Sequence, residues 1–573
     1  VAKCRERKCL NGAHLECAFV PVIAYLEWCG IKLDQNKWKA KMQQDANTKK
    51  IFRNILNDFI ISNCQNKKTF ISYIRLLNRE SEEDIEKERK LYKNETRKTE
   101  LDIYEDSVLT YEAYEIKTDI KLPSSYIEVN YQGDLFNGFN TEPQCIINWD
   151  SSQQVIPVLN ILGFNTKILD KKSGEEKESA LEKVLSKQKG INDIFLNIYL
   201  NYKEADKVCT TYGQTYLNAI NPLTERIHTN FKQIGTTSGR MSCGSKEINI
   251  ALAKLKHLPT STKNNNLKVS YPQLQNLPAT EQTRSCFVSK KGNKFASGDY
   301  NALESRLGAD IYNEPAMIEE YLYGSGDIHS LVAKACFPQE LADVPVKEIK
   351  KKRPDLRKKA KAPEFAKQFG GGAFSISESL GISIEEAQKI EQSYDESFKG
   401  ITTYAKKALE LIKQNGYILI HPLTGHKVYW YEYKMWKKRQ SSFDESFMQY
   451  YKKLKNSLTP EEFNKTKEKK LLSKHYKIIS KWGRLGLNSP TQGTGAIILK
   501  QAMITFYHWI LHNNLFDIVL LVNLVHDEVD IEYPENLDFV SNTLKEHMEK
   551  AANIFCKKLP IPVEVSVGDH WIH

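Results

Sequence analysis

The chain lacks long apolar runs and paired cysteines. Among its 573 residues the most apolar late stretch, 515–525, is short and is interrupted by Asp517 and Asn523, so no membrane span is predicted. The first residues are not followed by the apolar run of a signal peptide. Eleven cysteines are scattered without the paired spacing of a metal site. They therefore indicate reduced thiols of an intracellular protein.

The sequence also lacks an internal repeat, a long low-complexity tract and an excess of acidic residues. Its 82 Lys and Arg stand against 71 Asp and Glu, a formal net charge of +11. Such a charge favours a polyanionic partner because cations attract phosphates, although a merely basic soluble protein would carry it too. At this length the chain should divide into two to four compact units.

Local patterns indicate where several helices begin and end. Apolar residues at helical spacing predict a helix over 17–29 that ends before Gly30, followed by a short extended piece over 31–34. Capping-box patterns at Ser383 and Thr459 each predict a helix start.

Three tracts depart from the pattern of an ordinary core. Residues 79–90 are too highly charged for a core and predict a solvated helix or a mobile arm. Frequent Gly, Asn, Tyr and Pro over 123–143 indicate an irregular insertion. Residues 430–482 interleave aromatic residues with Lys and Arg, a mixture that can stack on and contact single-stranded nucleic acid. An insertion whose aromatics pack locally is the alternative.

Acidic residues in two strand-like settings carry the first sign of chemistry. Asp527 and Glu528 stand at the predicted tip of a β-hairpin, and Asp299 lies in a second strand-like run, 295–301. Carboxylates brought together from distant strands can hold two divalent metals about 3.5 to 4 Å apart, the arrangement used in in-line phosphoryl transfer. The pattern therefore predicts a metal-dependent enzyme that acts on phosphates.

A basic segment lies between these acids. Arg357, Lys361, Phe365 and Phe369 recur every four residues, so on a helix they form one stripe. Two cations followed by two aromatics can bind a triphosphate at one end and stack on a base or sugar at the other. A solvated helix face is the alternative for an isolated basic helix, but the position between the acids favours a nucleotide site.

Together these residues resemble the motifs of family A DNA polymerases, the bacterial DNA polymerase I class. The stripe, closed by Phe369 and Gly370, resembles the finger-helix motif, and the runs that include Asp299 and Asp527 resemble the two carboxylate motifs. Further matches, all in family order, lie at residues 226–231, 237–242, 274–278, 327–329 and 488–494. The resemblance covers nearly the whole chain from Glu16 onward.

The resemblance implies an α+β, right-hand polymerase fold with an antiparallel palm sheet, a helical thumb and helical fingers. The implied division is 1–44 as a segment leading into the palm, 45–232 as the thumb with a charged insertion near 65–140, 233–313 as the first part of the palm, 314–483 as the fingers with a basic aromatic insertion near 430–482, and 484–573 as the second part of the palm.

The resemblance also implies roles for individual residues. Two Mg²⁺ ions, for which Mn²⁺ could substitute, would be held by Asp299, Asp527 and the carbonyl of Tyr300, with Glu528 in a secondary catalytic role. The incoming deoxynucleoside triphosphate would be bound by Tyr300, Glu304, His329, Arg357, Lys361 and Phe365. Within that set, Lys361 would also protonate pyrophosphate, and Glu304 would cover the 2′ position of the sugar. DNA primer-template would be contacted by Arg240, Phe369, Arg484, Asn488, Gln492 and His526.

The chain departs from the family pattern at three positions. Ala302 replaces a common glutamine, and Phe369 stands where tyrosine is usual. Pro363 lies inside the nucleotide helix, where its missing backbone donor predicts a kink or a new helix start. Because no upstream Asp-x-Glu strand of a proofreading nuclease is visible, we expect proofreading to be absent, supplied by a separate proofreading or processivity partner, or carried on sequence not included in this chain.

The predicted activity is template-directed addition of deoxynucleotides to a primer 3′ end, in DNA replication or repair. We expect a monomer in the cytoplasm, in a nucleoid or a phage-infected bacterial cell, with an organelle as the alternative. A single-subunit RNA polymerase and a catalytically silent nucleic-acid-binding protein are the rival functions. Glu304 and the Asp527-Glu528 pair argue against an RNA polymerase. The presence of both Asp299 and Asp527, together with the phosphate-binding cations, argues against a catalytically silent protein.

Overall fold

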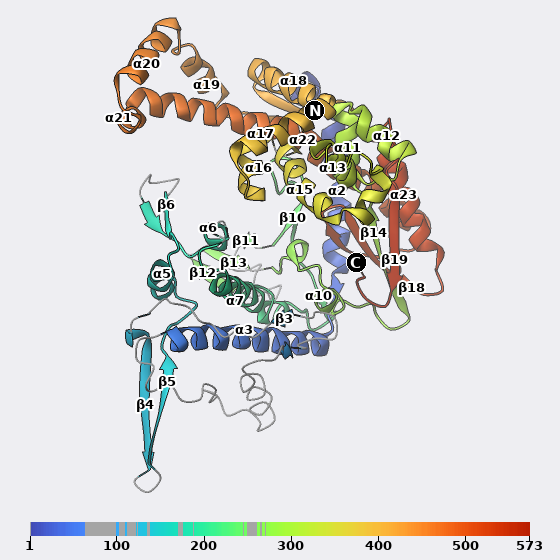
Figure 1. Ribbon diagram of the computed structural model, residues 1–573. Coiled ribbons are helices and arrows are strands. Elements are labelled where there is room, and N and C mark those ends of the chain that lie inside the picture. Colours follow the sequence, from blue (N-terminus) through green and yellow to red (C-terminus); the bar gives the residue numbers. More distant parts are fainter. Residues whose placement is uncertain are drawn as a thin grey trace. The chain divides into compact units, whose positions relative to one another are not determined.

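The chain forms two compact units, Asn36–Leu217 and the larger Val1–Gln35 with Asn218–His573 (Figure 1). The computed structural model describes residues 2–63, 99–101, 109–111, 122, 124–134, 138–169, 176–186, 188, 190–244, 246–248, 260–263, 266–269, 271–368 and 370–572. The charged run 79–90 and Phe369 lie outside these ranges. None of the helices within them has the length and hydrophobicity of a membrane span.

The smaller unit combines helices with short antiparallel hairpins. Its helices are α3 (Gln35–Asn63), α5 (Ser152–Ile161), α6 (Glu182–Leu185), α7 (Asp193–Thr211) and α8 (Gln214–Leu217). Its strands pair as β2 (Thr99–Leu101) with β3 (Leu109–Tyr111), β4 (Ile127–Asp134) with β5 (Gly138–Cys145), and β6 (Lys167–Leu169) with β7 (Glu176–Glu178). An aromatic core joins α3 to α7, because the rings of Phe59 and Phe195 pack 5.1 Å apart.

The prediction of an irregular insertion over 123–143 is wrong. Strands β4 and β5 form a regular antiparallel hairpin there, with Ile127 opposite Cys145 and Asp134 opposite Gly138. The signal was present in the sequence, because apolar Ile127, Val129 and Tyr131 alternate with polar residues in the two-residue period of a strand. The prediction gave more weight to the turn-forming residues nearby than to this short alternation.

The larger unit is organised around a four-stranded antiparallel sheet. Its strand order is β17 (Leu520–Val525), β18 (Glu528–Pro534), β14 (Asn293–Tyr300) and β19 (Val563–Gly568). The predicted hairpin is therefore confirmed, and the predicted strand over 295–301 is its neighbour in space. Branched and aromatic side chains that fit a buried pleated surface are frequent in β17 and β18, and both strands are almost entirely buried.

Helices surround this sheet and extend away from it. They are α1 (Ala2–Glu6), α2 (Leu10–Cys29), α10 (Glu281–Arg284), α11 (Leu303–Tyr312), α12 (Pro315–Tyr323), α13 (Ile328–Cys336), α14 (Val346–Lys352), α15 (Pro354–Gln368), α16 (Ala373–Leu380), α17 (Ile384–Ser397), α18 (Lys399–Asn415), α19 (Tyr433–Gln440), α20 (Glu445–Ser457), α21 (Pro460–Lys465), α22 (Lys467–His512) and α23 (Phe539–Phe555). Shorter strands pair as β1 (Ile31–Lys32) with β8 (Arg226–Ile227), β9 (Phe231–Lys232) with β10 (Ser242–Cys243), β15 (Tyr417–His421) with β16 (His426–Tyr429), and β13 (Asn266–Val269) with both β11 (Lys246–Ile248) and β12 (Thr260–Lys263).

The helix boundaries bear out the capping predictions but not the new helix start. Ser383 and Thr459 each form a complete capping box, at the starts of α17 and α21. Helix α2 ends at Cys29, as predicted. Helix α15 instead runs through Pro363 without a break, so the prediction of a new start there is wrong. Proline forfeits one backbone hydrogen bond, which the packing of buried Leu356 and Ala360 offsets.

A glycine next to Asp299 lets helix α23 approach the sheet closely. An added Cβ at Gly298 would lie 3.0 Å from Met548 Sδ and 3.2 Å from Leu544 Cδ2. The hydroxyl of Tyr300 reaches the same helix and donates to the Met548 carbonyl at 2.8 Å. Helix α23 thus covers the face of β14 that carries Gly298 and Tyr300, and Asp299 points to the opposite face.

We expect Gly298→Val to destabilise the protein by about 1–3 kcal/mol, because the extra methyl groups overpack the contact with α23. Urea unfolding followed by tryptophan fluorescence measures this. In a Met548→Ala background the same substitution should cost less, since the nearest atom is gone. An equal cost in both backgrounds would contradict the close-approach explanation.

Candidate active site

The register of the central sheet brings the predicted acids together. Asp299 lies opposite Glu528 in the antiparallel pairing of β14 with β18, and Asp527 is the residue just before Glu528, in the tight turn between β17 and β18. His526, the other turn residue, takes a left-handed conformation with φ of 55°. Residues 228 positions apart in sequence therefore meet at one end of the sheet.

The electrostatics of this pair are unfavourable in the protein alone. Burial raises the pKa of Asp299, and the negative charges of Asp527 and Glu528 raise it further, to about 7. Burial also raises the pKa of Asp527, while its backbone hydrogen bond and the nearby His526 and Arg240 lower it. Crowded carboxylates of this kind are stabilised by a divalent cation, which replaces repulsion with attraction.

The donor set fits a hard metal ion. Asp299 and Asp527 supply carboxylate oxygens, and Tyr300, the last residue of β14, supplies a backbone carbonyl. Within the described ranges no group of three or more His, Cys, Asp and Glu side chains is arranged to hold a metal. Mg²⁺ is commonly held by one or two carboxylates together with substrate phosphates.

A line of buried acids along β18 was not identified from the sequence. Glu528, Asp530 and Glu532 alternate with apolar residues, and all three are at most 4% exposed. The Glu528 carboxylate accepts hydrogen bonds from Arg284 Nη1, at 3.1 Å to Oε2, and from the indole of Trp571.

The other two acids of this line have equally specific partners. Asp530 accepts from Ser297 Oγ at 2.6 Å and from Asn523 Nδ2 at 3.1 Å, and burial together with the charge of Glu528 raises its pKa strongly. Glu532 accepts from Arg226 Nη2 at 2.7 Å. The period-two spacing of the acids in a strand was the available signal, but acids at that spacing usually face solvent.

Glu304 is fixed by two of the residues predicted to contact DNA. Arg240 donates from Nη2 to Glu304 Oε2 at 2.7 Å, and Gln492 donates from Nε2 to Glu304 Oε1 at 3.1 Å. Glu304 also raises the pKa of Asp527, so its carboxylate lies within electrostatic range of the acid pair. Four predicted site residues from separate parts of the chain therefore share one site.

The predicted phosphate-binding residues lie on two packed helices. On α15, Arg357 is partly exposed, and Lys361 and Phe365 are exposed, on the face opposite buried Leu356 and Ala360. The Arg357 guanidinium donates to both carboxylate oxygens of Asp327 at 2.9 Å, which forms a bidentate ion pair. The Asp327 carboxylate therefore occupies the donors of Arg357 that are predicted to bind phosphate.

A second acid, Glu364, contacts His329, which is also predicted to bind phosphate. His329 on α13 contacts Glu364 through Nδ1, at 2.5 Å from Oε2. Glu364 is buried in α15, so this contact links the two helices as well as engaging the imidazole. A bound triphosphate would compete with Asp327 for Arg357 and with Glu364 for His329.

The remaining predicted DNA contacts lie on α22. Arg484 is exposed, and Asn488 and Gln492 are partly exposed, one helical turn apart on a single face. Gly370, just after α15, has a φ of 66°, and an added Cβ would lie 2.6 Å from Arg484 Cγ. The end of the nucleotide helix thus abuts α22 at Arg484.

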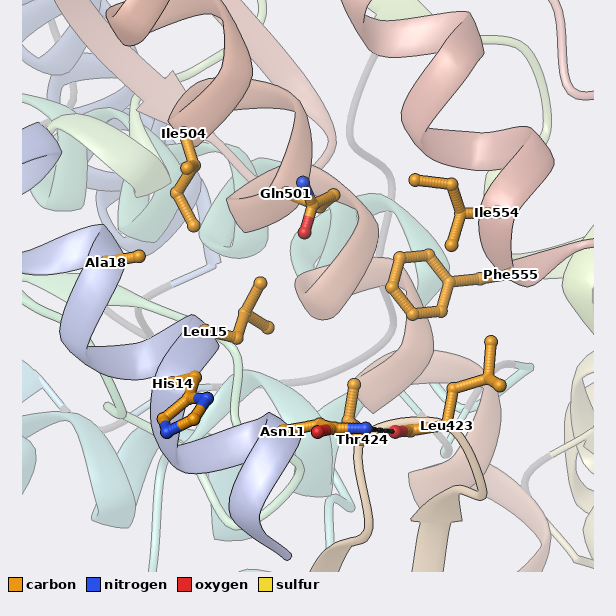
Figure 2. A pocket seen from close by; sticks show the side chains of 10 residues that line it. All are labelled: Asn11, His14, Leu15, Ala18, Leu423, Thr424, Gln501, Ile504, Ile554 and Phe555. Atoms are coloured by element: carbon orange, nitrogen blue, oxygen red, sulfur yellow. Dashed lines mark hydrogen bonds between the residues drawn. The ribbon is translucent and has the colours of Figure 1, made fainter.

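A separate pocket lies between α2, α22 and α23. Its volume is about 350 Å³, and its apolar lining includes Leu15, Ile504 and Phe555 (Figure 2). At its edge Asn11 donates from Nδ2 to the Leu423 carbonyl at 2.9 Å. Among the described residues that line it, none is a predicted site residue, so this pocket is distinct from the acid pair.

Comparison with known proteins assigns the chain to a family. The family model of DNA polymerase family A matches residues 139–257 and 253–573, well over half of the chain. This protein therefore belongs to DNA polymerase family A, and the predicted family is confirmed.

Individual relatives agree with that assignment. DNA polymerase I of Caldicellulosiruptor bescii is 28% identical over 379 residues, which cover 65% of this chain and 35% of that protein. The thermostable DNA polymerase I of Thermus aquaticus is 26% identical over 380 residues, covering 65% and 36%. The chain thus aligns with about a third of the length of these curated relatives.

A solved structure supports the fold. The polymerase domain of Pol1 from M. smegmatis, in complex with DNA primer-template and dNTP, superposes with a TM-score of 0.54 at 24% identity, over 74% of this chain and 61% of that chain. The predicted α+β right-hand polymerase fold is confirmed.

We expect Arg284→Met to destabilise the protein by about 3–5 kcal/mol, because it leaves the Glu528 carboxylate buried without its cation. Urea unfolding is the measurement. Adding Glu528→Gln to Arg284→Met should recover part of the loss. Lys294→Met, which breaks a solvent-exposed pair with Asp569, is the matched control and should have a far smaller effect. A loss no larger than that control would refute a structural role for the buried pair.

Proposed function

We propose that this protein is a DNA-directed DNA polymerase that adds deoxynucleotides to a primer 3′ end by two-metal phosphoryl transfer, in DNA replication or repair. The observation that carries this proposal is the meeting of Asp299 and Asp527 at one end of the sheet, with a raised pKa at both. Membership of DNA polymerase family A and the likeness to a polymerase domain support it.

The acid pair would form the metal site. Asp299, Asp527 and the Tyr300 carbonyl would hold two Mg²⁺ ions, with Mn²⁺ as a substitute. When bound, the ions would lower the pKa of the primer 3′-hydroxyl and neutralise charge on the triphosphate. Glu528 would act as a positioning residue, because its carboxylate is already engaged by Arg284 and Trp571 and anchors the turn that carries Asp527.

The triphosphate would bind along α15. Arg357 and His329 would exchange their present acidic partners for phosphate oxygens, and exposed Lys361 would add a third cation and donate a proton to departing pyrophosphate. Phe365, on the same face one turn further along, would stack on the nucleotide. Competition from Asp327 and Glu364 keeps the cations oriented before the nucleotide arrives.

Sugar selection would depend on Glu304. Its carboxylate is held from two sides by Arg240 and Gln492, which restricts its rotamers. A fixed side chain at the 2′ position excludes ribose by a steric clash. The same two partners, with Asn488, Arg484 and His526, would contact primer and template without reading sequence.

The partners and setting follow from this activity. DNA primer-template and deoxynucleoside triphosphates would be the ligands of a monomer in the cytoplasm, with proofreading or processivity supplied by a separate partner. The smaller compact unit, Asn36–Leu217, would form most of the thumb, for which the resemblance implies residues 45–232. The central sheet would be the palm, and residues 314–483, from α12 to the first part of α22, would be the fingers.

Primer extension on a defined template tests the proposal. We expect extension with Mg²⁺ that stops on chelation, and a loss of about 10³-fold or more with Asp299→Asn or Asp527→Asn. Glu564→Gln, which removes a nearby negative charge outside the acid pair, is the matched control and should retain most activity. Tight primer-template binding without any extension would instead favour a catalytically silent binding protein.

We expect Glu304→Ala to raise ribonucleotide incorporation, relative to deoxynucleotide incorporation, by about tenfold or more, because it removes the clash with the 2′-hydroxyl. Glu304→Gln keeps the side-chain volume and should retain discrimination. Single-nucleotide incorporation with matched ribo- and deoxynucleotides measures both. Unchanged sugar selectivity in the alanine variant would contradict the assignment.

A further inference from the structure

One helical arm, residues 430–482, accounts for most of the net positive charge of the chain. This arm carries 14 Lys and Arg against 6 Asp and Glu, a net charge of +8 within a total of +11. It comprises α19, α20, α21 and the first part of α22. Figure 1 shows the three short helices gathered at the N-terminal end of α22, away from the central sheet. Within the parts of the chain that are described, none of these 14 cations forms an ion pair with a carboxylate.

The tryptophans of the arm form its core rather than a stacking platform. Trp430 packs on Trp436 and Trp482, with ring centroids 4.7 Å and 5.0 Å apart, and Trp436 stacks on His475 at 5.5 Å. Trp430 and Trp436 are only 4% and 5% exposed. Of the two alternatives left open by the sequence, local packing describes these tryptophans. The arm is therefore a folded scaffold that displays its cations.

Five lysines of the arm, together with Arg484 just beyond it, form one row along α22, which we call the lysine stripe: Lys467, Lys470, Lys474, Lys477, Lys481 and Arg484. Their spacing alternates between three and four residues, so they fall within an arc of about 100°. All six are exposed, whereas Leu472, His475 and Trp482 on the other side are buried against the arm. The stripe spans about 25 Å at 1.5 Å per residue.

Nothing in the folding of α22 accounts for this stripe. Neighbouring cations at three- and four-residue spacing repel one another and destabilise a helix. Cations in the first turn, such as Lys467 and Lys470, also oppose the helix dipole. The only acid in the whole helix is Glu468, which lies on the buried side. A polyanion bound along the stripe would turn this repulsion into attraction.

The position of the stripe identifies which polyanion fits. Its inner end continues on the same face into Asn488 and Gln492, and Gln492 contacts Glu304, the proposed sugar-selecting residue. Arg484 abuts Gly370 at the end of the nucleotide helix. Gln492 and Arg484 thus lie on one face of α22, at Glu304 and at the end of α15 respectively. Under the proposed function, the part of this face beyond Arg484 would lie ahead of the nucleotide site, where the template is not yet paired.

We propose that the lysine stripe binds the phosphates of the unpaired template strand ahead of the active site. This inference rests on the proposed function. It adds a sequence-independent electrostatic track, carried by α22 itself, that holds the template in line with the site at which each new pair forms.

The test is binding of primer-template, without nucleotide, by fluorescence anisotropy at several KCl concentrations. Two DNAs share one duplex and differ in the 5′ template overhang, one short (about 2 nucleotides) and one long (about 12), so that only the long one can lie along the 25 Å stripe. The stripe variant replaces all five lysines with glutamine. The matched control removes five exposed cations elsewhere in the arm: Lys434, Lys438, Lys452, Lys453 and Lys455, also to glutamine.

We expect the unaltered protein and the control to bind the long overhang more tightly than the short one, and the stripe variant to lose that preference. The slope of log K against log [KCl] for the long overhang should become shallower by about 3.5 in the stripe variant, at about 0.7 for each of five lost single-strand phosphate contacts. Equal losses in both variants, or a stripe variant that weakens both DNAs alike, would overturn the proposal.

These experiments distinguish a failure of the polymerase proposal from a failure of the lysine-stripe proposal. A protein that binds as expected but extends no primer would contradict the polymerase assignment and leave the stripe as a template-binding surface. A protein that extends primers while the stripe variant keeps its overhang preference and salt slope would contradict the stripe alone. Circular dichroism of both variants checks that the arm remains helical, which solvent-exposed Lys→Gln substitutions should not disturb.

Discussion

The antiparallel pairing of β14 with β18 is the constraint on which the site depends. It sets Asp299 opposite Glu528, and the two-residue turn before Glu528 then places Asp527 beside Asp299. A shift of this register by one residue would turn Asp299 toward α23, where Gly298 now admits Met548 and Leu544. The close helix contact on one face and the acid pair on the other therefore fix the same register.

The central sheet contains several buried acids, and each of those along β18 has a partner that stabilises its carboxyl group. Glu528 is paired with Arg284, Asp530 is hydrogen-bonded to Ser297 and Asn523, and Glu532 is paired with Arg226. Each buried acid thus ties β18 to a different neighbour, which fixes the strand that carries the catalytic turn. Asp299 and Asp527, at the end of the sheet, have raised pKa values and form no ion pair among the described residues, which is a property expected of a metal site.

Helix α22 connects the proposed chemistry to the proposed DNA track. Its second half is packed in the core of the larger unit, with Lys500 ion-paired to Glu16 of α2 at 2.6 Å. Its middle presents Gln492 to Glu304, and its first half carries the cationic arm. Because these parts belong to one continuous helix, a template held along the arm would be held in register with the sugar-selecting residue. An insertion connected to the core through a loop would not impose that alignment.

The sequence by itself determined the strand that carries Asp299, the hairpin that carries Asp527, and the helix that carries Arg357, Lys361 and Phe365, because these follow from local period and residue type. It also determined the class of protein, through the resemblance of its ordered motifs to those of a known family. It did not determine the β4–β5 hairpin, the unbroken passage of α15 through Pro363, or the engagement of Glu528 by Arg284 and Trp571. Only the tertiary structure decided those, because packing and long-range pairing override local propensity, and the burial of acids along β18 depends on partners up to about 300 residues away, as the contact between Arg226 and Glu532 illustrates.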